Sequence, residues 1–536
     1  MKALPLTLRG MMVAACALAG AAIPHLAHAQ ASPALKAEAA ANVDAHAKMV
    51  ANAVDQIFSY AEPGFQEFKS TRYIADLLEK EGFKVEFGVA GIPTAFKATW
   101  GEGGPLIALG SDIDCLLGVS QYPGTGKLTP MVAGAPGHGE GHNSGMPLIV
   151  AAAIAAKDVM TKHGIKGRLL IWPGIAEELL ATKAYYVRDG LFKGVDANIF
   201  THVASGFQTG WGEMGNNGLV SVEYTFHGKT AHAAGDPWDG LSALDAVEIM
   251  DTAWNFRREH LPVTQRSHYV ITNGGGQPNV VPDLATVWYY FRERTFKSVA
   301  DLYKTGNEVA DGAAKATGTT VEHRILGYAA PNYGNKPLAE AAYENIKLVG
   351  MPKWTAEDQA FTKTVQTTLG RPVKPLATTV GELSTPASRP RSIGGGSDDV
   401  GDIMWTVPSI TIGFPSNIPS MIGHNKTSAM AMATPIAHKG AVAGAKAVAM
   451  TVLDLMTTPK LIAEAKGFQK NVQFKEDTYA PLISATDKPA IWLNHDVMEK
   501  LRPSMEKFYF DSAKYPNYLA QLGIAYPGGA DKDPTK

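Results

Sequence analysis

The sequence has little cysteine, no run of basic residues and no long apolar stretch beyond its N-terminus. Cys16 and Cys115 are the only cysteines among 536 residues, and Cys16 lies in a segment that we expect to be removed, so no intramolecular disulfide is expected. The formal charge of −2, without a polybasic run, argues against nucleic acid or an anionic membrane as the main partner. No later stretch reaches the ~18 continuous apolar residues that a membrane span needs. We therefore expect a globular protein. The composition does not exclude a small neutral or anionic substrate.

Residues 1–29 are typical of a secretory signal peptide. Two basic residues precede the apolar run MMVAACALAGAAI, and Ala27-His28-Ala29 has the small-x-small pattern after which signal peptidase cuts. The sequence thus predicts export, most simply to the periplasm, and a mature chain that begins near Gln30. A lipid anchor on Cys16 is the less favoured alternative, because the apolar run before it is too short.

The chain from residue 46 to 215 alternates helix-like and short apolar segments, which is typical of an α/β domain with a mostly parallel sheet. The strands that we expect are residues 106–110, 168–172, 197–201 and, much later, 409–414. The last of them indicates that this domain is interrupted and resumes downstream. We therefore predict a main domain in two parts, residues 30–217 and 328–457.

The interruption, residues 218–327, has the pattern of a small domain of its own. Apolar residues alternate over 218–227, and helical spacing follows in DGLSALDAVEIMDTAWNFRREH. Two strands, a helix and a last strand complete the order β-α-β-β-α-β, which predicts a ferredoxin-like inserted domain. Residues 458–536 are expected to form helices and loops packed on the outside of the main domain. A role of this extension in docking a partner is a hypothesis that only its length supports.

Acidic residues or histidines follow each of the four expected strands. They are Asp112 and Asp114 after the first strand, Glu177 and Glu178 after the second, His202 after the third, and His424 at the end of the loop after the fourth. In open α/β sheets the loops at the carboxyl ends of the strands converge and bind ligands. The loop GHGEGHNSG, residues 137–145, adds His138, Glu140 and His142 just before an apolar helix. Its glycines let the backbone turn sharply, so that Glu140 and His142 face the same point.

These side chains suit one or two divalent metal ions, because imidazole nitrogens and carboxylate oxygens bind zinc, manganese or cobalt. In the pair Glu177-Glu178, one carboxylate can bind metal while its neighbour acts as general base for metal-bound water. Each residue also has a structural interpretation. A single histidine is more often hydrogen-bonded within the fold, Glu-Glu more often begins a solvated helix, and Asp112 and Asp114 equally fit turns. The convergence of four independent strand ends favours the metal site.

The order of the motifs resembles the aminoacylase/carboxypeptidase metallopeptidase family over roughly residues 45–455. The motifs are GHGEGHNSG, PGIAEE, THV, HGKTAHAAGDPWDGLSALDAVE, SHYVITNGGGQPNVVPD, GGGSDDVGD and IGHNKTS. HGKTAH with NVVPD is the most specific part, and the amidohydrolase branch of the family is the most similar. The resemblance implies a two-metal α/β catalytic domain and an inserted lid domain that forms a homodimer.

By position in these motifs, the resemblance implies Glu177 as the general base and five metal ligands, Glu140, His142, Glu178, His202 and His424. The amidohydrolase branch usually has cysteine where Glu140 stands. We expect two zinc ions, and because a carboxylate makes the site harder than cysteine would, manganese or cobalt are alternatives. The family's His-x-Asp motif is also absent, and in its region we assign Asp114 only as a residue that orients a ligand.

The resemblance also assigns three residues of the inserted domain. His232 would reach across the dimer and stabilise the oxyanion that develops on the scissile carbonyl. Asn279 and Arg292 match positions that hold the carbonyl or the carboxylate of the substrate, and a guanidinium suits a carboxylate geometrically. The structural alternatives are a capped turn histidine for His232 and a strand-face residue for Arg292.

Together these features predict metal-dependent hydrolysis of an amide bond, in which Glu177 moves a proton from water to the leaving amine. The expected substrates are N-acyl or N-aroyl amino acids, including compounds like aminobenzoyl-glutamate, or small peptides with a free carboxylate. Two alternatives remain. One is a dipeptidase or carboxypeptidase with the same site, and the other is a catalytically silent periplasmic binding protein that keeps the fold.

Overall fold

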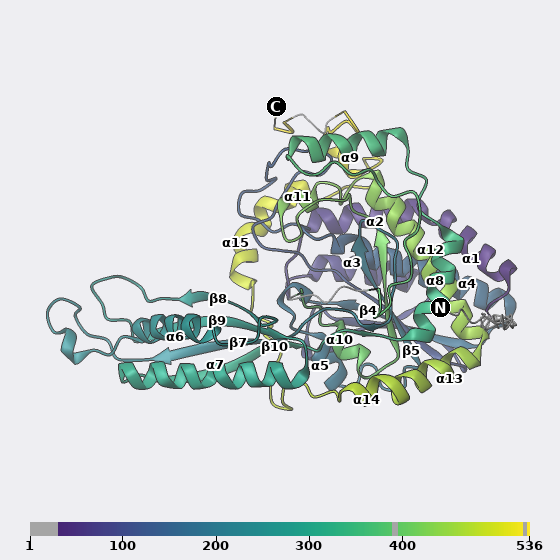
Figure 1. Cartoon of the computed structure of the whole chain (residues 1–536). Coiled ribbons are helices and arrows are strands. Elements are labelled where there is room, and N and C mark those ends of the chain that lie inside the picture. Colours follow the sequence, from purple (N-terminus) through teal and green to yellow (C-terminus); the bar gives the residue numbers. More distant parts are fainter. Residues whose placement is uncertain (1–29, 389–394, 529–532, 536) are drawn as a thin grey trace, which may run out of the picture.

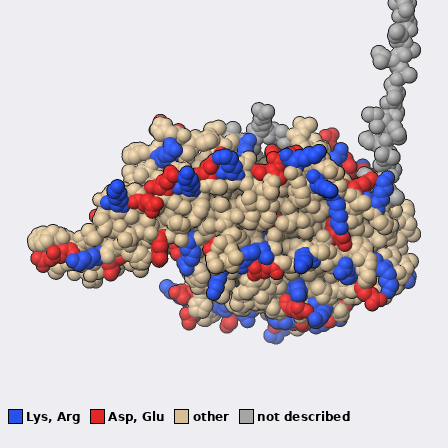
Figure 2. Space-filling model, turned by 90° about the horizontal axis from the view of Figure 1, so that it is seen from below, with Lys and Arg blue, Asp and Glu red and all other residues tan. Residues whose placement is uncertain are grey.

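The computed structural model describes residues 30–388, 395–528 and 533–535, so the predicted signal peptide, residues 1–29, lies outside the described chain. Figure 1 shows a wide α/β domain and a narrower domain that projects from it. Basic and acidic side chains are interspersed over the face drawn in Figure 2, without a large area of one sign. This distribution agrees with the small formal charge of −2.

A six-stranded sheet forms the centre of the α/β domain, in the order β1-β2-β4-β3-β5-β12. Its strands are β1 Lys84–Phe87, β2 Phe96–Glu102, β3 Leu106–Asp112, β4 Gly167–Gly174, β5 Ala197–Ala204 and β12 Ser409–Pro415. The last four are parallel and contain the four predicted segments, whereas β1 and β2 pair antiparallel at one edge. The sequence pattern does not predict β1 and β2, because their half-exposed side chains form no continuous apolar run.

Two apolar helices form the centre of the core of this domain. Its helices are α1 Pro33–Ala45, α2 Ala47–Tyr60, α3 Phe68–Lys80, α4 Gly145–His163, α5 Lys183–Arg188, α8 Lys336–Val349, α9 Ala356–Thr368, α10 Val400–Met404, α11 Lys426–Ala429 and α12 Pro435–Thr457. α4 and α12 are long and apolar enough to cross a membrane by length and composition alone, but 83% of the most apolar window of each is buried inside the protein. They pack closely, since a Cβ at Gly444 would lie 2.3 Å from Leu148 Cδ1. Their apolarity is therefore explained by the core.

The inserted domain has the predicted order of elements. They are β7 Gly218–His227, α6 Ala243–Arg258, β8 Arg266–Asn273, β9 Leu284–Glu293, α7 Phe296–Thr317 and β10 Thr320–Ala329. The sheet order β10-β7-β9-β8, with all pairs antiparallel, is that of a ferredoxin-like domain. Val287, Tyr289 and Phe291 of β9 are buried in the core of this domain. The alternate residues of β9 lie on the other face of the sheet, which contacts the α/β domain where the Tyr290 hydroxyl donates to Leu179 O at 3.2 Å.

The C-terminal extension packs against both domains. Its helices are α13 Pro459–Phe468, α14 Phe474–Glu476, α15 His495–Met505 and α16 Tyr518–Gln521. On α15, Met498 and Met505 are buried in one cluster with Cys115 of the α/β domain. The guanidinium of Arg324, on β10, lies 4.3 Å from the ring centre of Trp492 in the extension. Part of the extension therefore packs against the rest of the chain.

Arg502→Ala is expected to destabilise the protein. Arg502, on α15, forms an ion pair with Glu62, whose side chain is fully buried and also accepts hydrogen bonds from the amides of Lys69 and Ser70. Without the guanidinium a buried carboxylate loses its cation, which lowers the free energy of unfolding by about 1–3 kcal/mol. Urea denaturation measures the change, with the exposed Arg294→Ala as control. An unfolding midpoint equal to that of the wild type would show that this contact contributes nothing.

Candidate active site

The carboxyl ends of the parallel strands bring the predicted side chains together. β3 ends at Asp112, β4 leads to Glu177 and Glu178, β5 contains His202, and the loop after β12 contains His424. The glycine-rich loop leads into a short 3₁₀ helix, His142–Ser144. Before it, Gly141 has a φ of 123°, and a Cβ there would lie 2.3 Å from Met432 Sδ. This turn therefore requires glycine.

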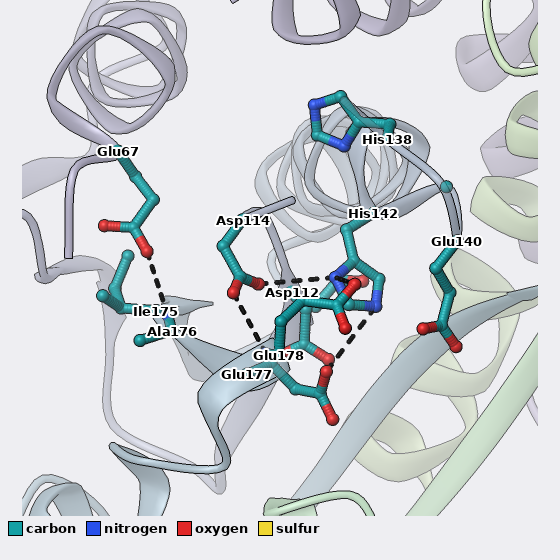
Figure 3. Close-up of polar contacts among 12 residues, drawn as sticks. Glu67, Asp112, Asp114, His138, Glu140, His142, Ile175, Ala176, Glu177 and Glu178 are labelled. Atoms are coloured by element: carbon teal, nitrogen blue, oxygen red, sulfur yellow. Dashed lines mark hydrogen bonds and ion pairs between the residues drawn. The ribbon is translucent and has the colours of Figure 1, made fainter. Parts of the chain in front are cut away.

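The two adjacent glutamates lie in a turn that lets both face His142 (Figure 3). The 3₁₀ turn Glu177–Leu179 is flanked by Ala176 and Leu180, which have left-handed φ values of 51° and 52°. Residues with a Cβ rarely adopt this conformation, and such strain often marks functional sites. One carboxylate oxygen of each glutamate lies 3.9 Å from a ring nitrogen of His142. Adjacent side chains on a regular strand point to opposite faces, so it is the strained turn that lets both glutamates face His142.

Two buried carboxylates hold this turn in place. Glu67 Oε1 accepts a hydrogen bond from the amide of Ala176 at 2.9 Å, and Asp114 Oδ2 accepts one from the amide of Glu178 at 3.0 Å. Asp114 Oδ1 also lies 3.4 Å from His142 Nδ1 (Figure 3). Asp114 therefore contacts two predicted ligands without being one of them, which is the placement of a residue that orients ligands.

The five predicted metal ligands form two overlapping groups. Glu140, His142 and His202 offer ligand atoms within 4.8 Å of one another, and so do Glu140, Glu178 and His424. Glu140 belongs to both groups, because its Oε1 lies 3.3 Å from His202 Nε2 and its Oε2 lies 2.8 Å from His424 Nε2. If cations are bound, Glu140 would therefore supply a carboxylate oxygen to either group.

The donor atoms at this centre fit divalent cations. His142 Nε2 and Glu178 Oε2 are buried and have no hydrogen-bond partner among the described residues. Buried polar atoms are nearly always paired, so these two point to a ligand, and imidazole with carboxylate suits zinc, manganese or cobalt. His138 of the same loop lies outside the centre, because its Nε2 contacts Ile57 O at 3.1 Å. His138 has the structural role of a hydrogen-bonded core histidine.

Burial dominates the electrostatics of the cluster. It raises the pKa of Glu178 to about 8, and it raises the pKa of Glu177 well above the usual range, with neighbouring carboxylates adding to the shift. Burial acts in the same direction on Glu140, but hydrogen bonds from two histidines outweigh it and hold the pKa of that carboxyl well below the usual range. Carboxylates crowded into a buried site favour the binding of a multivalent cation.

A cavity of about 520 Å³ opens beside these residues. Its wall includes Glu140, Glu177, Glu178, His202 and His424, and also Arg292, Gln208, Asn332 and Ser397. Arg292 Nη1 lies 3.5 Å from Ser397 Oγ, whereas its Nε is buried and has no hydrogen-bond partner within the described parts of the chain. A guanidinium with an unused donor in this wall is suited to hold a carboxylate.

His232 and Asn279 lie away from this cavity within a single chain. They belong to the loops after β7 and β8, at the end of the inserted domain that points away from the α/β domain (Figure 1). His232 Nδ1 accepts hydrogen bonds from the amides of Ala234 and Gly235 at 3.1 and 3.0 Å. In one chain it therefore has the geometry of a turn histidine. The roles assigned to both residues require a second copy of the chain and stay predictions.

A second buried cluster lies against the ligands and is not predicted by the sequence. Lys183, at the start of α5, lies 2.6 Å from Asp112 Oδ1 and forms an ion pair with Asp399. Glu177, Asp398 and Asp399 offer oxygens within 4.8 Å of one another. The motif GGGSDDVGD draws attention to the two aspartates but gives no partner for them. Nothing in the sequence around Lys183 indicates that its side chain is fully buried.

Comparison with known proteins gives matches over most of the chain. Residues 214–317 match the M20 peptidase dimerisation domain. The chain is 33% identical over 471 residues to one of the subunits of the p-aminobenzoyl-glutamate hydrolase of Escherichia coli, and the alignment covers 82% of this chain and 96% of that protein. It is 28% identical over 451 residues to the Xaa-Arg dipeptidase of Mus musculus, with 82% and 93% covered.

Solved structures are similar in fold. A putative aminohydrolase from methicillin-resistant Staphylococcus aureus has a TM-score of 0.51 at 19% identity, covering 78% of this chain and 100% of that one. An aminobenzoyl-glutamate utilization protein from Klebsiella pneumoniae has a TM-score of 0.50 at 16% identity, covering 77% and 96%. These matches confirm the predicted α/β class with an inserted domain.

Proposed function

Because the chain belongs to the M20 peptidase family, as its motifs predicted, we propose that it cleaves the amide bond of N-acyl or N-aroyl amino acids that carry a free carboxylate. The chain is a metal-dependent hydrolase of C–N amide bonds, and the proposal concerns its substrates and the roles of its residues. The observation that carries it is the convergence of Glu177 with five ligand side chains, of which all but His142 line one cavity together with Glu177 and Arg292.

Glu177 is the proposed general base. Its carboxylate lines the cavity and lies 3.9 Å from His142 Nε2, but it belongs to neither of the ligand groups that share Glu140. Two divalent cations held by those groups would polarise the scissile carbonyl and make a water more acidic. Glu177 takes the proton from the attacking water and passes it to the leaving nitrogen.

The protein is further proposed to bind zinc, to form a homodimer and to be exported to the periplasm. Zinc is the proposed cation because three histidines suit it, and manganese or cobalt are the alternatives because Glu140 adds a hard oxygen ligand. The match to a peptidase dimerisation domain supports a homodimer formed through the inserted domain. The signal-peptide pattern of residues 1–29 supports export to the periplasm.

An assay of the purified chain with two substrate classes tests the proposal. The classes are N-aroyl amino acids, including p-aminobenzoyl-glutamate, and dipeptides. Turnover of the aroyl compounds with little turnover of dipeptides is expected. The reverse preference would favour a dipeptidase, and the 28% identity to a dipeptidase makes this the second candidate. Absence of turnover with both classes in metal-supplemented protein would instead favour a silent binding protein.

Arg292→Met is expected to weaken substrate binding. Loss of a charge-assisted hydrogen bond of about 1.5–3 kcal/mol corresponds to a roughly 10- to 100-fold lower kcat/KM for substrates with a carboxylate. The matched measurement uses the same substrates with a carboxamide in place of the carboxylate, for which wild type and variant should differ little. An equal loss on both series would show that Arg292 supports the fold and does not bind the carboxylate.

A further inference from the structure

A second cavity, of about 280 Å³, lies on the face of the inserted domain that contacts the α/β domain. It is lined by Leu179, His268, Tyr269, Val270, Trp288 and Tyr290. All but Leu179 belong to the neighbouring strands β8 and β9, where His268 pairs with Tyr290 and Val270 with Trp288. The cavity is therefore a feature of this sheet face and of the turn that carries the active-site glutamates.

This cavity shares a wall with the active site. Leu179 lines it, whereas the residues on either side, Glu178 and Leu180, line the active-site cavity. Along β9, Tyr290 lines the second cavity and Arg292, on the same face of the strand, lines the first. The guanidinium of Arg292 lies 5.4 Å from the ring centre of Tyr290, whose hydroxyl donates to Leu179 O at 3.2 Å. The two cavities are therefore neighbours, with Leu179, Tyr290 and Arg292 at their common border.

The lining presents flat apolar surfaces. The rings of Trp288 and Tyr290 are 5.7 Å apart at 75°. Their polar ends are occupied, since Trp288 Nε1 donates to Ser221 Oγ at 2.8 Å and the Tyr290 hydroxyl donates to the backbone. Burial and three nearby arginines lower the pKa of His268, which favours the neutral form of its ring. An apolar cavity of ~150 Å³ accepts benzene, so this one has room for an aromatic ring.

We propose that this cavity is a subsite of the active site that binds a flat apolar group of the substrate, in particular an aromatic ring. The inference rests on the proposed function, because it assumes an amide substrate whose carboxylate is held by Arg292. The ring can belong to the acyl half or to the amino-acid half of the substrate. Both sources share the chemistry that the lining recognises, and the choice of substrates distinguishes them.

Val270→Asp tests the subsite, because the new carboxylate places a charge in the cavity. Val270 is 57% exposed, so the change does not disturb a core. The substrates are N-acetyl-alanine, N-benzoyl-alanine and N-acetyl-phenylalanine. At least one aromatic substrate is expected to lose about tenfold or more in kcat/KM relative to N-acetyl-alanine, and the one that does identifies the half that binds. Unchanged ratios for both aromatic substrates would overturn the proposal. Val263→Asp, at a residue 71% exposed and outside the cavity, is the matched control and should leave all three rates unchanged.

A second measurement tests binding at the subsite without the hydrolysis reaction. N-benzoyl-glycine and N-acetyl-glycine are titrated calorimetrically into Glu177→Gln protein with and without Val270→Asp. The benzoyl compound is expected to bind more tightly than the acetyl compound, and Val270→Asp should remove that difference. Equal affinities of both compounds for the parent protein would overturn the subsite. If the wild type cleaves none of the substrates but this difference appears, the proposed function fails and the subsite stands.

The position of Val270 on the edge strand β8 requires a check of assembly. Sedimentation velocity identifies a variant whose oligomeric state differs from that of the wild type. In that case Val270→Phe, which fills the cavity without adding charge, replaces Val270→Asp in both measurements. The same loss of preference for aromatic groups is expected, and an unchanged preference would again overturn the subsite.

Discussion

Glu177→Gln is expected to lower kcat by ~10²–10⁴-fold, the usual contribution of a general acid–base residue, while the bound metal is retained. The amide is nearly isosteric with the carboxylate but cannot accept the proton of the attacking water. Metal should stay bound because Glu177 is absent from both ligand groups that contain Glu140. Steady-state kinetics and elemental analysis of the same protein sample measure the two effects together.

The control for this variant is Glu102→Gln, at an acid whose side chain is 84% exposed and which pairs with Gly167 at the start of β4, whereas the cluster lies beyond the carboxyl end of that strand. It should match the wild type in rate and metal content. If Glu177→Gln loses metal in proportion to activity, Glu177 is a ligand and another group is the base. If its rate stays at the wild-type value, the catalytic role assigned to Glu177 is wrong.

Glu140→Ala is expected to reduce metal content and activity together. Glu140 contacts His202 at 3.3 Å and His424 at 2.8 Å, so its removal withdraws the one carboxylate that the two ligand groups share. Changes in residues that only orient ligands already cost about 10–100-fold, so loss of a ligand should cost at least a hundredfold in activity. Elemental analysis after dialysis and kinetics with added zinc, manganese or cobalt are the measurements.

Glu140→Cys gives a sharper version of the same test. Cysteine restores a ligand at this position but with a soft sulfur, so the variant should keep metal and prefer zinc over manganese more strongly than the wild type does. A Glu140→Ala protein that retains full metal content and activity would show that Glu140 does not bridge the two groups.

The strands that carry the site could be predicted because their signal is local. β3, β4, β5 and β12 are buried and apolar, and an acid or histidine follows or ends each of them. The inserted domain could be predicted because its strands alternate and its helices have helical spacing. Strands β1 and β2 escape prediction, because their stability comes from pairing at the edge of a sheet that already exists.

The ligands could be predicted by residue type, but their support could not. Glu67 lies more than a hundred positions before Ala176, and only the fold brings its carboxylate to the amide of that residue. Lys183 is paired with Asp399 across 216 positions, and a lysine in the segment ATKAYY gives no sign of burial. The same holds for Arg502, which reaches Glu62 from the far end of the chain. Contacts of this kind depend on tertiary packing, and no periodic pattern in the sequence indicates them.

Anomalous X-ray diffraction from crystals of the zinc-loaded protein, measured on both sides of the zinc edge, tests the central claim most directly. Two peaks are predicted, one among Glu140, His142 and His202 and one among Glu140, Glu178 and His424, with the carboxylate of Glu140 between them. Zinc peaks only at other positions, or the absence of any peak at these ligands in protein that turns over substrate, would contradict the account.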